Sequence, residues 1–189
     1  MLDGLFRCAN IPREGGNRMN AIDLLLAQHR EIENLFSQCK KATGEDKLEL
    51  FHAIADLLVL HTAIEEKHFY PEALEGVSEG QVREALEEHL LVKRSLADLL
   101  ALDALDGEFD AKLQVLEELV EHHVKEEETE LFPAAENELS TARLQEVGAA
   151  LERMTAELEE EEALYERVQD VDELVRAAPL YQEGQRPQG

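Results

Sequence analysis

The sequence predicts an all-α protein, an up-down-up-down four-helix bundle followed by an additional C-terminal helix. Apolar residues recur three, four and seven positions apart along four long segments, as on one face of a helix. Short turn signals separate these segments, so consecutive helices should pack antiparallel. The sequence carries no competing strand pattern.

The first residues lack this periodicity. Residues 1–19 contain several glycines and a proline and are expected to form an irregular N-terminal arm. The four expected bundle helices cover residues 20–41, 47–74, 78–105 and 108–139. Ser78 and Gln81 have the spacing of a capping box at the start of the third helix.

The C-terminal part should be an accessory acidic helix in residues 140–178, helical as far as Arg176, and a flexible tail in residues 179–189. Pro71 and Pro133 should kink or end the second and fourth bundle helices, because proline donates no backbone hydrogen bond.

Composition limits the classes of function. The 189 residues suffice for one hydrophobic core, and 18 Lys and Arg against 43 Asp and Glu give a net charge of −25. This charge repels phosphates and anionic lipids, so neither nucleic acid nor a membrane is an expected partner. No apolar run approaches the roughly 20 residues that span a bilayer, and no signal peptide is evident, which predicts a cytoplasmic protein. Cys8 and Cys39 cannot form a disulfide framework and should be reduced thiols.

Each bundle helix has a histidine in the middle of its apolar stripe, and two of these histidines are followed one turn later by a glutamate. The residues are His29, His61 with Glu65, His89, and His123 with Glu127. Burying such groups in a dry core costs several kcal/mol unless they are paired or bind a metal. Six convergent nitrogen and oxygen donors without a thiolate favour iron, with manganese or zinc as alternatives, and two carboxylates able to bridge favour two ions.

The pattern repeats within the chain. The segment from His61 to Pro71 realigns 62 residues later with the segment from His123 to Pro133, with His, Glu, Glu and Pro identical. The surroundings of His29 and His89 realign at an offset of 60. The two helix pairs are therefore expected to form a pseudo-twofold arrangement of equivalent half-sites.

These residues resemble the hemerythrin-like (HHE cation-binding) domain family, whose pattern is H…HxxxE…H…HxxxE over four helices. The resemblance covers residues 20–139 and implies a non-haem di-iron centre bridged by the two glutamates. It implies these metal ligands: His29, His61, Glu65, His89, His123 and Glu127. Oxygen-carrying members have a further histidine where this chain has Lys93. Glu33 and His68 are the candidates to replace it, and each could equally be solvated or lie outside the metal ligands.

The predicted function is binding or sensing of O2, or of peroxide or nitric oxide, at two iron ions in the bundle core. Two alternatives are an iron- or redox-responsive regulatory interaction protein and a weak di-iron peroxidase or catalase-like enzyme. No general base or nucleophile triad is evident, so turnover of an organic substrate is not expected. No catalytic residue and no organic cofactor is predicted; the protein partner and the oligomeric state stay open.

Four other residues are interpreted as bystanders. His52 and His122 should face solvent, and Tyr70 and Phe132 should be packing groups. A ferritin-like site is a weak alternative, because both ExxH pairs, at Glu49 and at Glu65, lie on one helix.

Overall fold

The computed structural model describes residues 19–74, 76–102, 105, 107–160 and 164–165. These residues form helices and connecting turns, without any strand. In chain order the elements are α1 (Ala21–Cys39), α2 (Gly44–Ile64), the π-helical turn η2 (Glu65–Phe69), α3 (Tyr70–Ala73), α4 (Glu79–Leu100), α5 (Gly107–Glu126), the π-helical turn η3 (Glu127–Leu131), α6 (Phe132–Glu138) and α7 (Thr141–Glu159).

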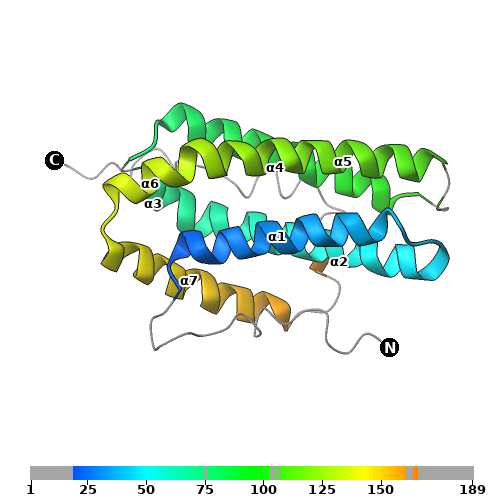
Figure 1. Cartoon of the computed structure of the whole chain (residues 1–189), viewed down its shortest axis with the longest axis horizontal. Coiled ribbons are helices and arrows are strands. Elements are labelled where there is room, and N and C mark those ends of the chain that lie inside the picture. Colours follow the sequence, from blue (N-terminus) through cyan, green and yellow to red (C-terminus); the bar gives the residue numbers. More distant parts are fainter. Residues whose placement is uncertain (1–18, 75, 103–104, 106, 161–163, 166–189) are drawn as a thin grey trace.

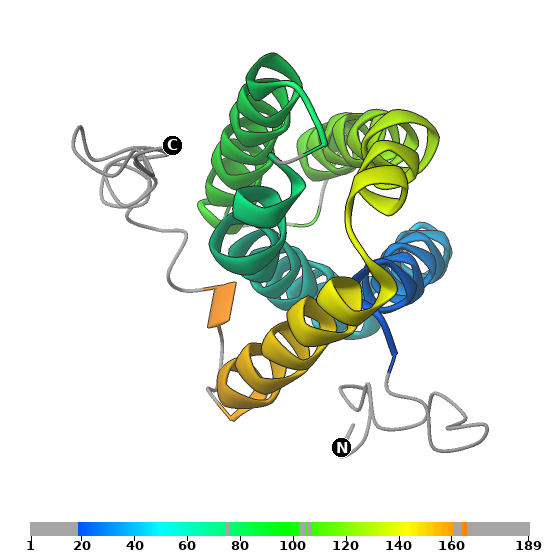
Figure 2. The ribbon, with the colours of Figure 1, turned by 90° about the vertical axis from the view of Figure 1, so that its left-hand side faces the viewer.

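Two antiparallel helix pairs make up the bundle (Figure 1). α1 pairs with α2, and α4 pairs with α5. Seen from one end, these four helices surround a common core, and α7 crosses the outer side of the α1–α2 pair (Figure 2). The predicted all-α fold class, a four-helix bundle with an additional C-terminal helix, is confirmed.

Side-chain caps begin three of the helices where the sequence predicts. The Asn20 side chain accepts a hydrogen bond from the backbone N–H of Asp23 at the start of α1. Ser78 and Gln81 form the predicted capping box at the start of α4, and Ser140 caps α7. Each cap satisfies a backbone donor that the first turn of a helix leaves free.

The predicted proline kinks take the form of two π-helical turns. η2 immediately precedes Tyr70–Pro71, and η3 immediately precedes Phe132–Pro133. The N–H groups of Tyr70 and Phe132 bond to carbonyls five residues back, those of Glu65 and Glu127. Proline lacks a donor and crowds the carbonyl four residues before it, so a widened turn at this point avoids the clash.

The wider turn changes which side chains face the core. In an α-helix, residues five apart point about 140° away from each other. Across η2, however, Glu65 and Tyr70 are both fully buried. The π turn thus adds Tyr70 to the interior face that already carries Glu65.

α7 packs closely against the start of α1 at a glycine. A Cβ atom on Gly148 would lie 2.6 Å from the backbone oxygen of Met19, so only glycine permits this approach of the two backbones. In the structure α7 ends at Glu159, and most of the residues from there to the expected end at Arg176 are not described. The arm up to residue 18 and residues 166–189 lie outside the described residues.

The expectation that the His52 ring faces solvent is wrong. His52 is half-buried, and its ring stacks on that of Tyr165 with centroids 4.5 Å apart. The backbone N–H of Tyr165 also donates a 2.7 Å hydrogen bond to Oδ1 of Asp56. Tyr165 therefore covers part of this face of α2.

Among the described helices, none is both long and apolar enough to cross a membrane. Cys39 is a buried free thiol, and burial raises its pKa to about 11. Cys8 lies outside the described residues.

Candidate metal centre

The six predicted ligands come together inside the bundle. His29 lies on α1, His61 on α2, Glu65 on η2, His89 on α4, His123 on α5 and Glu127 on η3, and each residue is at most 4% exposed. Their ligand atoms form two groups, each within 4.8 Å of one another: His29, His61, Glu65 and Glu127 in one, and Glu65, His89 and His123 in the other. Glu65 belongs to both groups.

Carboxylates connect the two helix pairs across the core. Nε2 of His29 lies 3.2 Å from Oε2 of Glu127. In the equivalent contact of the other half, Nε2 of His89 lies 3.3 Å from Oε2 of Glu65. Each glutamate also approaches the histidine one turn before it, His61 or His123. The predicted pseudo-twofold relation is therefore visible in the contacts of the site.

The Nδ1 atom of every site histidine is held by a neighbouring oxygen. Nδ1 of His29 and Nδ1 of His89 lie 3.0 and 2.9 Å from Oε1 of Glu128 and Oε1 of Glu66. Nδ1 of His61 lies 2.8 Å from Oε1 of Gln28, and Nδ1 of His123 lies 2.8 Å from Oε2 of Glu88. Carboxylate and amide oxygens accept, so Nδ1 carries the proton and Nε2 points inward with a free lone pair.

Burial lowers the pKa of two of the imidazoles and is outweighed at a third. It lowers the pKa of His89 to about 4 and that of His61 well below its ordinary value. For His123, burial acts in the same direction, but the carboxylates of Glu127 and Glu88 outweigh it and raise the pKa. Two of the imidazoles are thus held neutral at pH 7, the form that binds a metal.

The two carboxyl groups of the core titrate apart. Burial, and after it the nearby Glu127, raises the pKa of Glu65 well above its ordinary value. Burial has the same effect on Glu127, but the imidazoles of His123 and His29 outweigh it and lower the pKa of that carboxyl. A carboxylate at Glu65 therefore requires a compensating positive charge.

The polar atoms of this core fit a cation. Several buried atoms that could bind a metal have no hydrogen-bond partner: Nε2 of His29, Nε2 of His61, both side-chain oxygens of Glu65 and Oε2 of Glu127. Nε2 of His89 and Nε2 of His123 lie 3.0 Å apart. Because Nδ1 of each ring donates its proton to a glutamate, both of these Nε2 atoms carry lone pairs. A positive ion among these atoms would satisfy the unpartnered oxygens and separate the opposed lone pairs. Imidazole and carboxylate donors suit iron, manganese or zinc.

Tyr70 packs in the core as expected, and its hydroxyl in addition reaches the metal centre. Its hydroxyl donates a 2.9 Å hydrogen bond to Oε1 of Glu127 and lies 3.1 Å from Nε2 of His89. Burial, and next the charge of Glu127, raises the tyrosine pKa well above its ordinary value, so the hydroxyl keeps its proton at neutral pH. Phe132 does pack, with its ring stacked on His29.

Neither candidate for an additional ligand lies in the core. Glu33 has a 71% exposed side chain paired with Arg30. His68 is partly buried beside Arg153 and Glu157 of α7. Both are therefore solvated or peripheral, in agreement with the second of the two interpretations left open for them.

The other polar residues weighed from the sequence also lie outside the donor set. Lys93 is buried against the core and donates a 2.6 Å bond to Oε1 of Glu66. The His122 side chain is 62% exposed, in agreement with its interpretation as solvent-facing. Glu49 is exposed, so the ferritin-like pattern does not assemble among the described residues.

Comparison with known proteins identifies the family and supports the fold. Residues 20–135 match the sequence profile of the hemerythrin HHE cation-binding domain. The crystal structure of a protein from Mycobacterium kansasii that contains this domain is 24% identical, with a TM-score of 0.67 over 78% of this chain and 98% of that one, and supports the fold. A protein named DNA nickase from Nostoc sp. (strain PCC 7120 / SAG 25.82 / UTEX 2576) is 31% identical over 124 residues. That match covers 65% of this chain and only 35% of the nickase. The chain belongs to the hemerythrin HHE cation-binding domain family.

Proposed function

We propose that this protein binds two iron ions in the bundle core and uses them to bind or sense O2 or a related small oxidant, such as peroxide or nitric oxide. The observation that carries the proposal is the pair of overlapping donor groups that share Glu65. One shared carboxylate between two sets of ligands is suited to two adjacent ions.

The division of ligands follows from the contacts. His29, His61 and Glu127 would hold one ion, His89 and His123 would hold the other, and Glu65 would bind both. Bound iron supplies an accessible coordination position and one-electron redox chemistry. Gln28, Glu66, Glu88 and Glu128 keep the four Nε2 atoms inward, which pre-organises the site at no further cost in side-chain entropy.

The remaining core residues control water and protons. Phe132 covers the His29 ring, and Phe69 packs edge-on against Phe132 with ring centroids 5.4 Å apart. These apolar rings exclude water from that side of the site. On the other side, the Tyr70 hydroxyl keeps its proton and donates it in a hydrogen bond to Glu127, which orients that carboxylate toward the metal centre.

The charge of the chain supports a small ligand over nucleic acid. With a net charge of −25, phosphate backbones would be repelled, and no membrane or nucleic-acid partner is proposed. The activity named for the Nostoc protein is not assigned to this chain, which matches about a third of that protein's length.

The test is an anaerobic titration of the iron-loaded protein with O2, peroxide and nitric oxide, followed by visible absorption. We expect a ligand-dependent band that zinc-loaded protein lacks. Metal-dependent binding of a protein partner without any such band would instead favour the regulatory alternative. Sustained O2 release from peroxide would favour the catalase-like one.

A further inference from the structure

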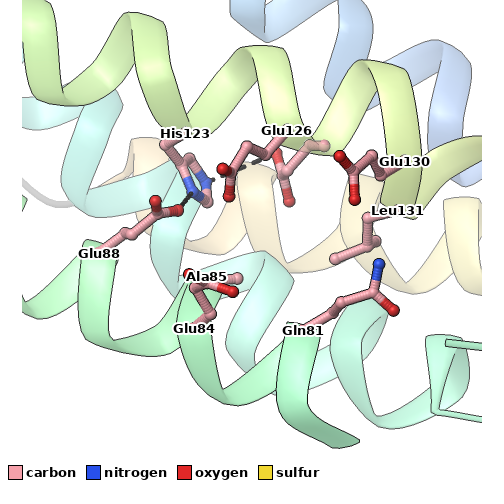
Figure 3. Close-up of a pocket in the computed structure, with 9 residues that line it drawn as sticks. Gln81, Glu84, Ala85, Glu88, His123, Glu126, Glu130 and Leu131 are labelled. Carbon is pink, nitrogen blue, oxygen red and sulfur yellow. Dashed lines mark hydrogen bonds and ion pairs between the residues drawn. The ribbon is translucent and has the colours of Figure 1, made fainter. Parts of the chain in front are cut away.

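A cavity of about 70 Å³ opens beside the metal centre, between α4 on one wall and α5 with η3 on the other (Figure 3). We call it the acidic vestibule and define it by six of its lining residues: Glu84, Glu88, His123, Glu126, Glu127 and Glu130. One water needs roughly 10–15 Å³ of such space, so the cavity can hold several waters or a partly hydrated ion.

The acidic groups of the vestibule lead from solvent to the metal centre. Glu84 and Glu130 are exposed at its rim, and Glu88 and Glu126 are partly buried further in. His123 and Glu127 are buried at its inner end and belong to the metal centre. The cavity therefore ends at a buried carboxylate of the metal centre, whose Oε2 has no hydrogen-bond partner.

Two other carboxylates beside the metal centre are neutralised by basic side chains, in contrast to the described carboxylates of the vestibule. Glu66 is paired with Lys93, and Glu128 with Arg30, both at 2.6 Å. Of the vestibule carboxylates, Glu88 and Glu126 form ion pairs only with histidines within the described part of the chain.

Two vestibule carboxylates also form a weaker set of donors with His122, an exposed residue beside the cavity. Nε2 of His122 lies 3.5 Å from Oε1 of Glu88 and 3.3 Å from Oε1 of Glu126. One ligand atom from each of these residues lies within 4.8 Å of the others. This group is more exposed than the core donors, so an ion there keeps water ligands and can leave again.

We propose that the acidic vestibule is the route by which a divalent cation, Fe²⁺ in the cell, reaches the buried metal centre. Glu84 and Glu130 concentrate the hydrated ion at the rim, and Glu88, His122 and Glu126 replace part of its water. Glu127 and His123 then receive the ion. This inference rests on the proposed function, because it requires that the core binds metal.

The experiment measures the rate of Co²⁺ uptake by metal-free full-length protein in a stopped-flow spectrometer. The test variant is Glu84→Gln/Glu126→Gln/Glu130→Gln, which leaves Glu88 in place as the partner of His123. The control is Glu49→Gln/Glu152→Gln/Glu159→Gln, which removes the same charge from exposed positions on α2 and α7. Final Co²⁺ content and thermal stability are measured for each protein.

At low ionic strength the vestibule variant should take up Co²⁺ at least about tenfold more slowly than wild type, since charged clefts raise association rates by about 10–1,000-fold. The uptake rate of the control variant should stay within about twofold of the wild-type rate. The final Co²⁺ content should be equal in wild type and both variants. Added salt should reduce the difference in rate between the vestibule variant and wild type, because salt screens the charges. Equal rates in the two variants would overturn the route and leave the proposed function standing. A lower final content in the vestibule variant would show that these carboxylates belong to the site itself, which also overturns the route. Wild-type protein that takes up no Co²⁺ would overturn both.

Discussion

The Tyr70 hydroxyl donates a 2.9 Å hydrogen bond to Oε1 of Glu127, and this bond joins the two halves of the pseudo-symmetric site. The equivalent residue in the second half is Phe132, which stacks on His29 with ring planes 13° apart. The repeat thus has the same histidines and glutamates in both halves, but a tyrosine in one half where the other has a phenylalanine. One side of the site has a proton donor, and the other has an apolar cover.

Replacing Tyr70 by Phe should weaken metal binding, because Glu127 loses the donor that orients it. Groups that orient metal ligands in this way contribute about 10–100-fold to affinity. We expect a loss in this range in a competition titration with a chelator. Tyr165→Phe removes a hydroxyl outside the core and should leave the affinity unchanged; an unaltered affinity in Tyr70→Phe would refute the role assigned to its hydroxyl.

Removing either core carboxylate should empty the site. Glu65→Gln and Glu127→Gln keep the side-chain shape but lose the negative charge that two cations require. The bound metal measured after desalting should fall to less than half of wild type. In wild type, metal should raise the melting temperature because it binds only the folded chain, and this increase should be absent from both variants.

His122→Ala is the control for these two variants, because it removes a nearby imidazole that is exposed. It should keep full metal content and the wild-type melting temperature. If all three variants behave alike, the assignment of ligands by their inward position is wrong.

The pH dependence of the metal-free protein should reveal Glu65. The pKa of Glu65 is raised in the folded state. Below its ordinary value of 4.5, the carboxyl is therefore protonated in both the folded and the unfolded chain, and its ionisation does not change the free energy of unfolding. As pH rises further, the unfolded chain releases the proton and the folded chain retains it, which destabilises folding by about 1.4 kcal/mol per pH unit until the folded pKa is reached.

Glu65→Gln removes this penalty, so its stability relative to wild type should increase from pH 5 to pH 7. Urea unfolding in the presence of a chelator measures this difference. Glu152→Gln, at an exposed position, should show no such trend. A constant or shrinking advantage for Glu65→Gln would contradict the raised pKa.

The contact between α1 and α7 depends on Gly148. Gly148→Ala places a methyl group 2.6 Å from the Met19 oxygen and should lower the free energy of unfolding by about 1–3 kcal/mol, because the helices must move apart. Gly107→Ala adds a methyl group where nothing lies within 4 Å and should not destabilise the protein. Urea unfolding compares them; equal stabilities would show that α7 tolerates displacement.

The bundle and the convergence of its six donors could be predicted because both follow from the helical period. Each of His29, His61, His89 and His123 lies within a regular α-helix, where position in the apolar stripe determines which side chains point inward. The offset of 62 residues also predicted the second half of the site from the first.

Tyr70 could not be placed in this way, because a π turn comes between it and Glu65. The α-helical period assigns it a direction that the widened backbone does not keep. The Tyr-Pro sequence at the end of the motif was the available signal, since proline forces the preceding helix to deviate. His52 was misplaced for a different reason: its stacking partner Tyr165 is distant in the chain, and no local pattern reports that contact.

The central claim is that the buried imidazoles and carboxylates hold two cations. The most direct test loads the full-length chain anaerobically with Fe²⁺, removes unbound metal by gel filtration, and counts iron per chain. It also records visible spectra after oxidation and again after dithionite. The account predicts two iron ions per chain and an oxidised band that dithionite removes. Protein that emerges without iron, with an unchanged spectrum, would contradict it.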